Sequence, residues 1–430
     1  MTITEAPITE APITEAPLRR RLGVVGEPPP GLRTTLGAVA ARRLFLAAFD
    51  RLDLTVRLHE PTGVRTIGRG GPVMEVHRPA ELFARLGRDA NLGFGEAYLT
   101  GAWDAEDLGA LLTVPAARLP QLVPAPLQLL RRAVVPRTTR RHRGDRDDTR
   151  RDVAHHYDLS NELFGLFLDP TMTYSSAVFR TDRHGMPLRG DDLEEAQHRK
   201  IDALLDLAGV GVGTRLLEIG TGWGELALRA AGRGALVRSI TLSCEQQELA
   251  RRRVEAAGLT DRVRIDLCDY RELEEEYDAV VSVEMVEAVG WRHWPSYFTT
   301  IDRVLAPGGR VAIQAITMPH DRMLRTRDDE TWMTKYIFPG GFLPSVEALR
   351  ATARRHTGLR LISEAAFGAH YAETLRQWDE SFRDRRAEVE AVGFDDDFCR
   401  MWHYYLEYCR AGFAAGYIDV HHLLFARETR

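Results

Sequence analysis

The order of apolar and polar positions separates the chain into two regions with different patterns. In the first region, residues 33–128, segments with helical spacing are mixed with segments in which apolar and polar residues alternate. The helical segments are 44–49, 80–86 and 108–112, and the alternating segments are 54–58 and 73–76. Alternation indicates strands and helical spacing indicates amphipathic helices, so this region is predicted to be a small α+β unit.

The second region, residues 151–430, repeats a buried strand followed by an amphipathic helix. The predicted strands are 214–219, 235–242, 262–267, 277–283, 309–316 and 359–363, and helical segments such as 246–257 separate them. This alternation is typical of an α/β fold with a doubly wound, mostly parallel, Rossmann-like sheet. Such sheets bind ligands at the carboxyl ends of their strands, so the pattern also predicts where the site lies.

Two segments outside these units lack the composition of a folded core. Residues 1–32 begin with Ile-Thr-Glu-Ala-Pro repeated three times, and we expect this tail to be disordered. Residues 129–150 are rich in arginine and are interpreted as a linker.

No secretory signal is recognised, and no apolar run reaches the roughly 18 residues of a membrane span. The four cysteines include no Cys-x-x-Cys pair, so we expect a cytoplasmic protein without a metal site.

The charge pattern is unusual in its choice of basic residues. The net charge of -5 offers no general attraction to nucleic acid, and no nucleic-acid partner is expected. Of the 57 lysines and arginines, only Lys200 and Lys335 are lysines.

A glycine-rich turn follows the first strand of the second region. Strand 214–219 runs directly into Gly220-Thr-Gly-Trp-Gly and then into a helix. Glycines let the backbone turn sharply and approach a ligand closely. A dinucleotide fingerprint would need glycine at the position of Glu225, whereas the pattern E-x-G-x-G-x-G begins at Glu218 and ends at Gly224. The turn therefore predicts S-adenosylmethionine (SAM) as cofactor, with Glu218 near its cationic amino-acid end.

The next two strand ends offer further contacts to this cofactor. Ser243, Glu245 or Gln246 follows the second strand and can hydrogen-bond ribose hydroxyls. Asp269 and Tyr270 follow the third strand, where an adenine edge and ring face are expected. Packing is the alternative role for Tyr270.

Seven ordered segments carry a resemblance to a known family. They are His156-Tyr-Asp-Leu-Ser-Asn, Leu168-Asp-Pro-Thr-Met-Thr-Tyr-Ser-Ser-Ala, Leu217-Glu-Ile-Gly-Thr-Gly-Trp-Gly, Thr241-Leu-Ser-Cys-Glu-Gln, Ser282-Val-Glu-Met-Val-Glu-Ala-Val-Gly, Tyr336-Ile-Phe-Pro-Gly-Gly-Phe and Gly416-Tyr-Ile-Asp-Val. Together they resemble the cyclopropane-fatty-acid synthase family, which includes mycolic acid cyclopropane synthases and methyltransferases. The resemblance covers about 151–430, and the unit 33–128 resembles the lipid-binding domain of the phospholipid-modifying members.

The resemblance implies SAM-dependent methyl transfer to a double bond of an unsaturated phospholipid acyl chain. The methylated chain is then a carbocation that must be shielded from water and lose a proton. The implied cofactor residues are Tyr157, Tyr174, Ser175, Gly220, Gly222, Thr241 and Gln246, to which the strand ends add Glu218, Gly224, Asp269 and Tyr270. Aromatic residues expected near the acyl chain are Trp332, Tyr336, Phe338, Phe342 and Tyr371, with core packing as the alternative for all but Tyr371.

In this family a bicarbonate ion, held by a cysteine, a glutamate, a histidine, a tyrosine and a backbone group, accepts the proton. Ser176 stands here at the cysteine position and Gln314 at the histidine position, whereas Glu287 and Tyr371 match and Ile316 follows at the backbone position. Serine and glutamine still donate hydrogen bonds, so a bicarbonate site can survive with altered geometry. The lone histidines His320 and His370 are interpreted as surface or packing residues rather than replacements.

If the segment is helical, Glu284 shares a helix face with Glu287, and at one turn's distance it is expected to raise the pKa of Glu287. With the base displaced, we expect the proton to leave a neighbouring chain carbon, which favours a methylene-branched product over a cyclopropane. A reductase would then complete the methyl branch, as in 10-methylstearate-type lipids.

Peripheral membrane contact and a homodimer are also expected. The alternatives are a cyclopropane synthase, a small-metabolite N- or O-methyltransferase and a non-catalytic lipid-binding protein.

Overall fold

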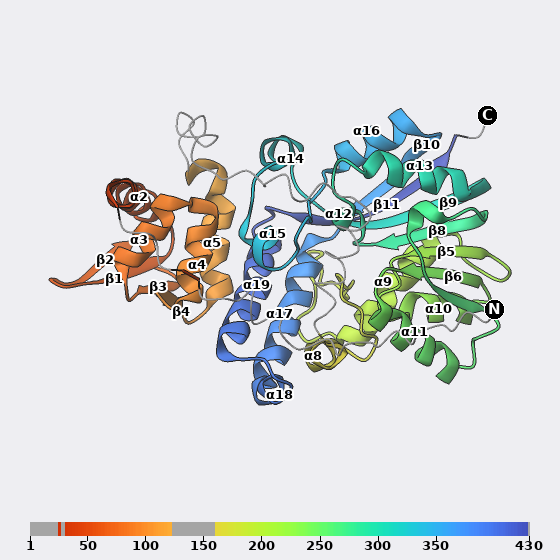
Figure 1. The fold of residues 1–430 in the computed structure, drawn as a ribbon, viewed down its shortest axis with the longest axis horizontal. Coiled ribbons are helices and arrows are strands. Elements are labelled where there is room, and N and C mark those ends of the chain that lie inside the picture. Colours follow the sequence, from red (N-terminus) through yellow and green to blue (C-terminus); the bar gives the residue numbers. More distant parts are fainter. Residues whose placement is uncertain (1–24, 27–30, 123–159, 429–430) are drawn as a thin grey trace, which may run out of the picture.

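The computed structural model describes residues 25–26, 31–122 and 160–428. The predicted linker and nearly all of the predicted tail lie outside these ranges. Figure 1 shows a small N-terminal unit, residues 31–122, beside a larger unit, residues 160–428. Among the described residues, no helix combines the length and apolar character that a membrane crossing requires.

The N-terminal unit contains a four-stranded sheet packed against helices. Its elements are α2 (Leu32–Phe49), β1 (Thr55–Glu60), β2 (Gly63–Gly68), β3 (Val73–Val76), α3 (Pro79–Arg88), α4 (Ala90–Leu99), β4 (Trp103–Ala105) and α5 (Leu108–Leu122). The strand order is β2-β1-β3-β4, with β1 and β3 parallel and the other pairs antiparallel. Val56, Leu58, Met74 and Val76 alternate along β1 and β3 and are fully buried, which is the burial that the alternating pattern predicts.

The larger unit contains the predicted doubly wound sheet. Its strands are β5 (Arg215–Ile219), β6 (Leu236–Thr241), β7 (Val263–Leu267), β8 (Tyr277–Val283), β9 (Leu305–Thr317), β10 (Leu359–Ala366) and β11 (Asp419–Arg427), in the order β10-β11-β9-β8-β5-β6-β7. β5 to β9 are parallel, and β11 runs antiparallel to both of its neighbours. The apolar pattern predicts six of these strands and misses β11, in which His421 and His422 interrupt the apolar run.

Helices cover both faces of this sheet (Figure 1). The helical elements of the larger unit are α8 (Asn161–Phe167), α9 (Leu193–Ala208), α10 (Glu225–Gly232), α11 (Cys244–Ala256), the 3-10 turn η1 (Tyr270–Glu272), α12 (Val286–Val289), α13 (Trp294–Val304), α14 (His320–Thr326), α15 (Trp332–Tyr336), α16 (Val346–His356), α17 (Gly368–Asp384), α18 (Arg386–Ala391) and α19 (Asp396–Ala414). Buried residues of α9, α10 and α11 pack on one face, and those of α13 and α16 pack on the other.

Capping residues fix the ends of α9 and α11, the helices that carry Lys200 and Gln246. Asp192 caps the start of α9 by accepting a hydrogen bond from the Glu195 N–H, and Gly209 ends the helix with a φ of 72°. Ser243 caps α11 by accepting from the Gln246 N–H. These are the residue types that favour such ends, because a short side-chain oxygen reaches the free N–H groups and glycine tolerates a left-handed backbone.

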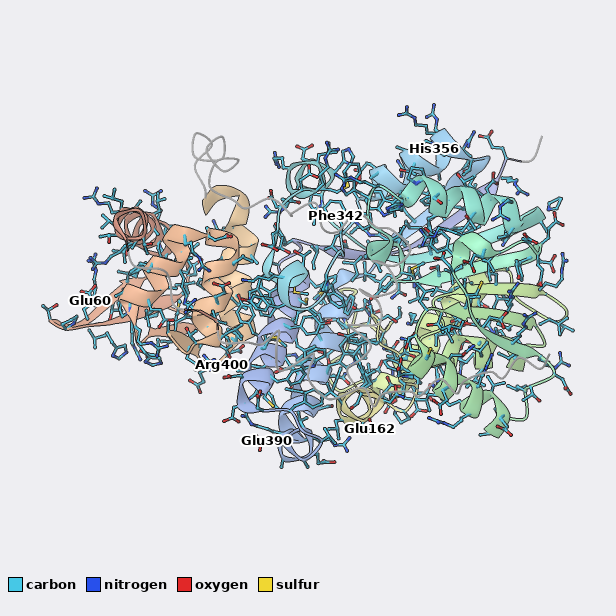
Figure 2. The ribbon with its side chains drawn as sticks, viewed as in Figure 1. Glu60, Glu162, Phe342, His356, Glu390 and Arg400 are labelled. Atoms are coloured by element: carbon cyan, nitrogen blue, oxygen red, sulfur yellow. The ribbon has the colours of Figure 1, made fainter. Side chains whose placement is uncertain are left out.

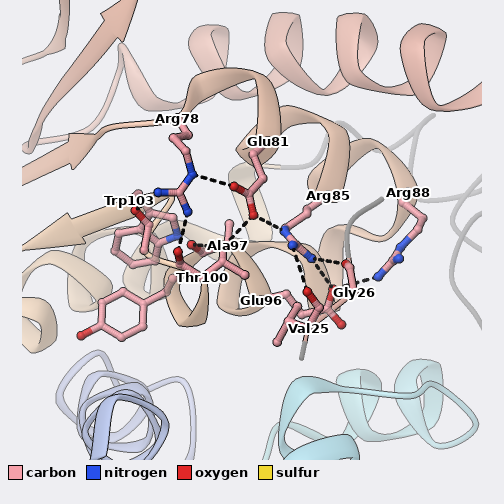
Figure 3. A network of polar contacts seen from close by, with 12 residues as sticks. Val25, Gly26, Arg78, Glu81, Arg85, Arg88, Glu96, Ala97, Thr100 and Trp103 are labelled. Atoms are coloured by element: carbon pink, nitrogen blue, oxygen red, sulfur yellow. Dashed lines mark hydrogen bonds and ion pairs between the residues drawn. The ribbon is translucent and has the colours of Figure 1, made fainter. Parts of the chain in front are cut away.

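A polar network joins the N-terminal unit to the larger unit. Glu96 of α4 is 1% exposed, and its carboxylate accepts hydrogen bonds from Lys335 Nζ at 2.6 Å and from the Tyr336 hydroxyl at 3.0 Å. Figure 3 shows the other side of this network, where Arg85 and Arg88 reach the same glutamate. One of the two lysines thus bridges the units.

Helix α19 makes a second contact with the N-terminal unit. Arg400, labelled at this junction in Figure 2, donates to the carbonyl oxygen of Tyr98 at 2.7 Å and to Asp104 Oδ2 at 3.0 Å. The ring of Tyr404 lies 5.0 Å from that of Tyr98 and 4.7 Å from that of Trp332. Stacked and edge-on aromatic pairs at such distances add to apolar burial, so the junction is both polar and apolar.

Candidate functional site

A cavity lies at the carboxyl ends of β5, β6 and β8, as the strand order predicts. Its wall includes the turn from Gly220 to Trp223, Thr241 at the end of β6, and Glu284 after β8. Gly220 and Gly222 have φ angles of 101° and 52°, a backbone region that glycine adopts without strain. The turn therefore brings bare backbone against the cavity.

Most of the expected cofactor residues line this cavity. They are Tyr174, Ser175, Glu218, Gly220, Gly222, Thr241, Gln246, Asp269 and Tyr270. Tyr157 lies outside the described residues. Gly224 is not on the wall but caps the start of α10, where an added Cβ would lie 3.1 Å from the Cβ of Ala250. Gly224 therefore permits the close approach of α10 and α11.

Glu218 and Lys200 are two ionisable side chains buried in the cavity wall. Ser239 Oγ donates to Glu218 Oε2 at 2.5 Å, and Lys200 Nζ donates to Ser175 Oγ at 2.6 Å. Burial raises the pKa of Glu218 to about 8 and lowers that of Lys200 to about 8, while the attraction between the two groups opposes both shifts. Lys200 was not among the expected site residues.

The side chains at the ends of β6 and β7 are hydrogen-bonded to protein groups. Thr241 Oγ1 donates to Gln246 Oε1 at 2.8 Å, and both residues face the cavity. Ser243 and Glu245 are not on its wall, so of the three candidates after β6 only Gln246 is in reach. Both oxygens of Asp269 accept hydrogen bonds from Arg271, whose guanidinium also lies over the Tyr270 ring.

The carboxylate of Glu284 is the centre of a second polar cluster beside the cavity. Its Oε1 accepts from the Ser176 N–H at 3.0 Å and from Gln314 Nε2 at 2.7 Å. Its Oε2 accepts from the Tyr371 hydroxyl at 2.7 Å. Burial raises the pKa of Glu284, whereas these three hydrogen bonds and the charge of Lys200 lower it.

The backbone at Glu284 is unusual. Its φ is 49°, and among the described residues only Met172 is another non-glycine residue with a positive φ. Glu284 therefore precedes α12 instead of sharing a helix face with Glu287, and the expectation of a shared face was wrong. Non-glycine residues in this region are mildly strained and persist where their surroundings hold them. Three hydrogen bonds to one carboxylate are such surroundings.

His422 orients the amide of Gln314. The two residues are paired in register on β11 and β9, and the His422 Nε2–H donates to Gln314 Oε1 at 2.9 Å. Burial lowers the pKa of His422 to about 3, so the ring is neutral and has one N–H to donate. With its oxygen held in this way, Gln314 presents its NH₂ group to Glu284.

Glu287 is held differently from Glu284. Its Oε1 accepts from the Ile316 N–H at 2.5 Å, and its Oε2 is buried without a hydrogen-bond partner. Burial, followed by the charge of Glu284, raises the pKa of Glu287 to about 8. The direction of this effect agrees with the sequence-based expectation, although burial is the larger cause. At neutral pH Glu287 is therefore mainly protonated.

Comparisons with known proteins identify this combination of sheet, cavity and cluster. The family of mycolic acid cyclopropane synthetases matches residues 144–423. The chain belongs to this family. It is 50% identical, over 95% of its length and 96% of the relative's, to tuberculostearic acid methyltransferase UfaA1 from Mycobacterium tuberculosis. It is 32% identical to the cyclopropane-fatty-acyl-phospholipid synthase of Escherichia coli strain K12, over 85% of this chain and 90% of that one.

Solved structures of the mycolic acid cyclopropane synthetase family share the fold. The structure of the cyclopropane synthase MmaA2 from Mycobacterium tuberculosis covers 65% of this chain and 98% of its own, with a TM-score of 0.58 and 31% identity. A structure of CmaA1 complexed with SAH and CTAB covers 64% of this chain and 97% of its own, with a TM-score of 0.58 and 30% identity. The protein is a SAM-dependent C-methyltransferase of this family, and SAM is its cofactor.

The cavity fits this cofactor. Glycine backbone at Gly220 and Gly222 leaves space against the turn, Gln246 offers an amide, and the carboxyl groups of Glu218 and Glu284 suit a ligand with ammonium and sulfonium groups. SAM supplies a methyl group that is activated by the positive charge on its sulfur.

The positions that hold bicarbonate in relatives of this family do not fit the ion here. Three of them, the Ser176 N–H, the Gln314 amide and the Tyr371 hydroxyl, already donate to Glu284. The fourth and fifth are bonded to each other, since the Ile316 N–H donates to Glu287. The Ser176 hydroxyl donates to the carbonyl oxygen of Ala177 at 3.1 Å. A protein carboxylate thus uses the donors that an ion would need.

Four of the five aromatic residues expected near the acyl chain are not on the wall of this cavity. Trp332 and Tyr336 belong to the junction with the N-terminal unit. Phe338 packs edge-on against Tyr405, and Phe342 stacks on Trp294. These contacts favour the packing alternative, and none of the four lines the cavity.

Two tyrosines lie near Glu284: Tyr174 is on the cavity wall, and Tyr371 donates its hydroxyl hydrogen bond to the Glu284 carboxylate. Tyr371 stacks on Phe413 with ring centroids 4.4 Å apart, and Tyr174 stacks on Trp378 at 5.2 Å. The Tyr174 hydroxyl shares a hydrogen bond of 2.6 Å with that of Tyr405 on α19.

The two histidines considered as replacements have structural partners. His370 Nδ1 accepts from the Phe179 N–H at 2.9 Å, and His320 Nδ1 lies 2.7 Å from Ser345 Oγ. Neither contacts the Glu284 cluster through these bonds, which agrees with their interpretation as packing or surface residues.

Proposed function

We propose that the protein transfers a methyl group from SAM to the double bond of an unsaturated fatty acyl chain of a phospholipid and releases a methylene-branched acyl chain. The observation that carries this proposal is the Glu284 carboxylate, held by three donors in the wall of the cofactor cavity beside the aromatic rings of Tyr174 and Tyr371. A carboxylate and aromatic faces are the groups that a carbocation reaction requires. The relative named as a tuberculostearic acid methyltransferase matches nearly the full chain and supports methyl transfer to a fatty acid.

The residues present account for each demand of the chemistry. The alkene needs no deprotonation, so its electron pair attacks the methyl carbon while the pair of the S–CH₃ bond stays on sulfur. Positive charge then resides on the other alkene carbon, where aromatic faces such as that of Tyr174 stabilise it and exclude water. Binding and orientation fall to the glycine turn, Thr241 and Gln246.

The branched product sets where the proton leaves. An exocyclic methylene carbon is the former methyl carbon, so the proton must leave that carbon, and the sequence-based expectation of a neighbouring chain carbon was wrong. A 1,2-hydride shift first moves the charge to the carbon that carries the methyl group. Loss of a methyl proton before this shift closes a cyclopropane ring instead. The two products therefore differ in the order of hydride shift and proton loss.

The first prediction separates these products. The protein incubated with SAM and vesicles of an oleoyl phospholipid is expected to release S-adenosylhomocysteine and to give exocyclic vinyl signals in proton NMR of the lipid. Mass spectrometry should show a gain of one CH₂ unit. Upfield cyclopropane signals would instead make the protein a cyclopropane synthase. Turnover with small amines but not with lipid would favour the metabolite methyltransferase, and no turnover with either would favour a lipid-binding protein.

A reductase is the expected partner in a branched-chain route. An exocyclic methylene group is not further changed by methyl transfer, and its conversion to a saturated methyl branch needs two electrons and two protons. The reaction that consumes the product is therefore the reduction of an unactivated carbon–carbon double bond.

Access to the acyl chain requires contact with a bilayer, and we infer that the outward face of α2 provides it. Leu36, Val39 and Leu44 are 62%, 49% and 49% exposed on this helix, and the neighbouring Arg43 is also exposed. Apolar side chains beside arginine are typical of helices that lie at a membrane surface. The alternative is that this face of α2 contacts a second copy of the chain in the expected homodimer.

The second prediction concerns this face. Leu36→Glu combined with Val39→Glu is expected to weaken binding to anionic vesicles at least about tenfold, because transferring each apolar side chain from water is worth about 1.5–3 kcal/mol. Co-sedimentation with vesicles measures the effect. Val212→Glu, at a residue 90% exposed on the larger unit, is the matched control and should bind as the wild type does. Unchanged vesicle binding together with loss of a dimer in sedimentation would assign the face to a second copy.

A further inference from the structure

The Glu284 carboxylate coincides with the set of donors that the family uses for an ion. Its two oxygens engage the Ser176 N–H, the Gln314 amide and the Tyr371 hydroxyl at 2.7–3.0 Å. A carboxylate and a bicarbonate ion share the same planar, negatively charged O–C–O group, so one set of donors can serve either but not both at once.

Several observations indicate that this placement is built into the chain. Glu284 takes a φ of 49°, where glycine would be unstrained, and thereby turns its side chain into the cluster. His422 holds Gln314 so that its NH₂ group, and not its oxygen, faces the carboxylate. Lys200, buried in the same wall, supplies a compensating positive charge.

Glu284 also faces the cofactor cavity, whereas Glu287 does not. Glu284 is on the wall of the cofactor cavity, whereas Glu287, Ser176, Gln314 and Tyr371 are not. The side chain is only partly buried, so it can accept a proton from a bound substrate and later return it to water.

We propose that Glu284 replaces bicarbonate as the base of this enzyme and itself removes the proton from the methylated acyl chain. This inference rests on the proposed function. In the step, a C–H bond of the new methyl group breaks, its electron pair forms the C=C bond of the methylene group, and the proton passes to the carboxylate.

The hydrogen bonds assign the oxygen that takes the proton. Oε1 faces two N–H donors, neither of which can accept a hydrogen bond. Oε2 faces the Tyr371 hydroxyl, which can rotate and become the acceptor once Oε2 is protonated. The proton therefore goes to Oε2, and Tyr371 positions the base in both of its states.

The test compares Glu284→Gly and Glu284→Gln with the wild type in carbonate-free buffer under nitrogen, using SAM and oleoyl phospholipid vesicles. Wild-type turnover is expected to be the same with and without added sodium bicarbonate. Both variants should lose about 10²- to 10⁴-fold in kcat, the usual contribution of a positioned base. Added bicarbonate or formate should restore much of the activity of Glu284→Gly, because the missing side chain leaves room for a small oxyanion. Glutamine fills that room, so Glu284→Gln should not be restored.

Controls separate loss of the base from loss of the fold. The melting temperature should stay near wild type in both variants, and glycine suits the positive φ of this position. Both variants lose the same carboxylate of the cavity wall, so a change in SAM affinity should be equal in the two and cannot explain the rescue of only one of them. Glu364→Gln, at an exposed carboxylate on β10, is the matched control and should keep wild-type activity. A wild type that turns over only with bicarbonate, or a Glu284→Gly variant that is active without it, would overturn the inference.

A binding measurement tests the inference without turnover. Titration of ¹³C-bicarbonate, followed by NMR line broadening, should show binding to Glu284→Gly and none to the wild type. Binding to the wild type at the same site, lost on addition of formate, would show that Glu284 does not fill it. If instead the wild type excludes the ion but does not methylate any unsaturated lipid, the proposed function fails while the replacement of the ion by Glu284 stands.

Discussion

Replacement of Gly220 with valine is expected to abolish SAM binding at concentrations that saturate the wild type. Gly220 has a φ of 101°, which a β-branched residue adopts only with strain, and it faces the cofactor cavity. Such strain alone costs about 1–3 kcal/mol, and a side chain here would also occupy space that the cofactor needs. An added Cβ would lie 3.3 Å from the side chain of Met285, next to Glu284.

Isothermal titration with SAM measures this effect, and lipid methylation should be lost with binding. Gly232→Val is the matched control, because Gly232 lies in α10 with no atom within 4 Å of an added Cβ. That variant should bind SAM within a few-fold of wild type. Binding of SAM by the Gly220 variant within the same range would show that the turn does not hold the cofactor.

The second large effect is expected from Lys200→Met, which removes the buried positive charge of the cavity wall. The attraction of Lys200 lowers the pKa values of Glu284 and Glu218. A base works only when it is deprotonated, so activity falls as the pH drops through the pKa of Glu284. Without Lys200 that pKa rises, and the acidic limb of the kcat profile moves to higher pH. On the acidic side of the limb, each pH unit of displacement lowers kcat about tenfold at a given pH.

The other groups near Glu284 do not produce the same displacement. Glu287, with a pKa raised to about 8, is largely neutral below that pH, Tyr371 has a pKa raised far above its usual value, and His422 is neutral above about pH 3. A pH profile of kcat measures the limb, and Lys335→Met, at the other lysine, should leave its position unchanged. If the acidic limb of the Lys200→Met profile lies at the same pH as that of the wild type, the charge of Lys200 does not affect the pKa of Glu284.

Periodicity and turn chemistry predict most of the fold because they report local burial. The strand before Gly220, the glycines of the turn and the side chains of Thr241 and Gln246 are fixed by short-range sequence, and the structure places all of them around one cavity. β11 is missed because paired histidines interrupt its apolar run, and one of them, His422, is buried in order to orient Gln314.

The cluster around Glu284 could not be predicted in the same way, because its members are far apart in sequence. Ser176, Glu284 and Tyr371 come from a loop, a strand end and a helix that meet only in three dimensions. Two signals were nevertheless present. Glu284 directly follows a buried strand, at the edge where ligands bind. Lys200 is a rare lysine at helical spacing with the buried residues Ala196 and Leu204 of α9.

The junction between the two units limits which residues are tolerated at Gly95 and whether the larger unit can be expressed alone. Gly95 has no side chain at the point where an added Cβ would lie 2.6 Å from the Trp332 ring, and α19 contacts both Tyr98 and, through Tyr405, the cavity residue Tyr174. Residues 160–428 expressed alone would expose Trp332 and Tyr404 and leave Lys335 without Glu96. The two units therefore share one continuous hydrophobic core, which includes Trp103 of the N-terminal unit and Trp332 and Tyr404 of the larger unit.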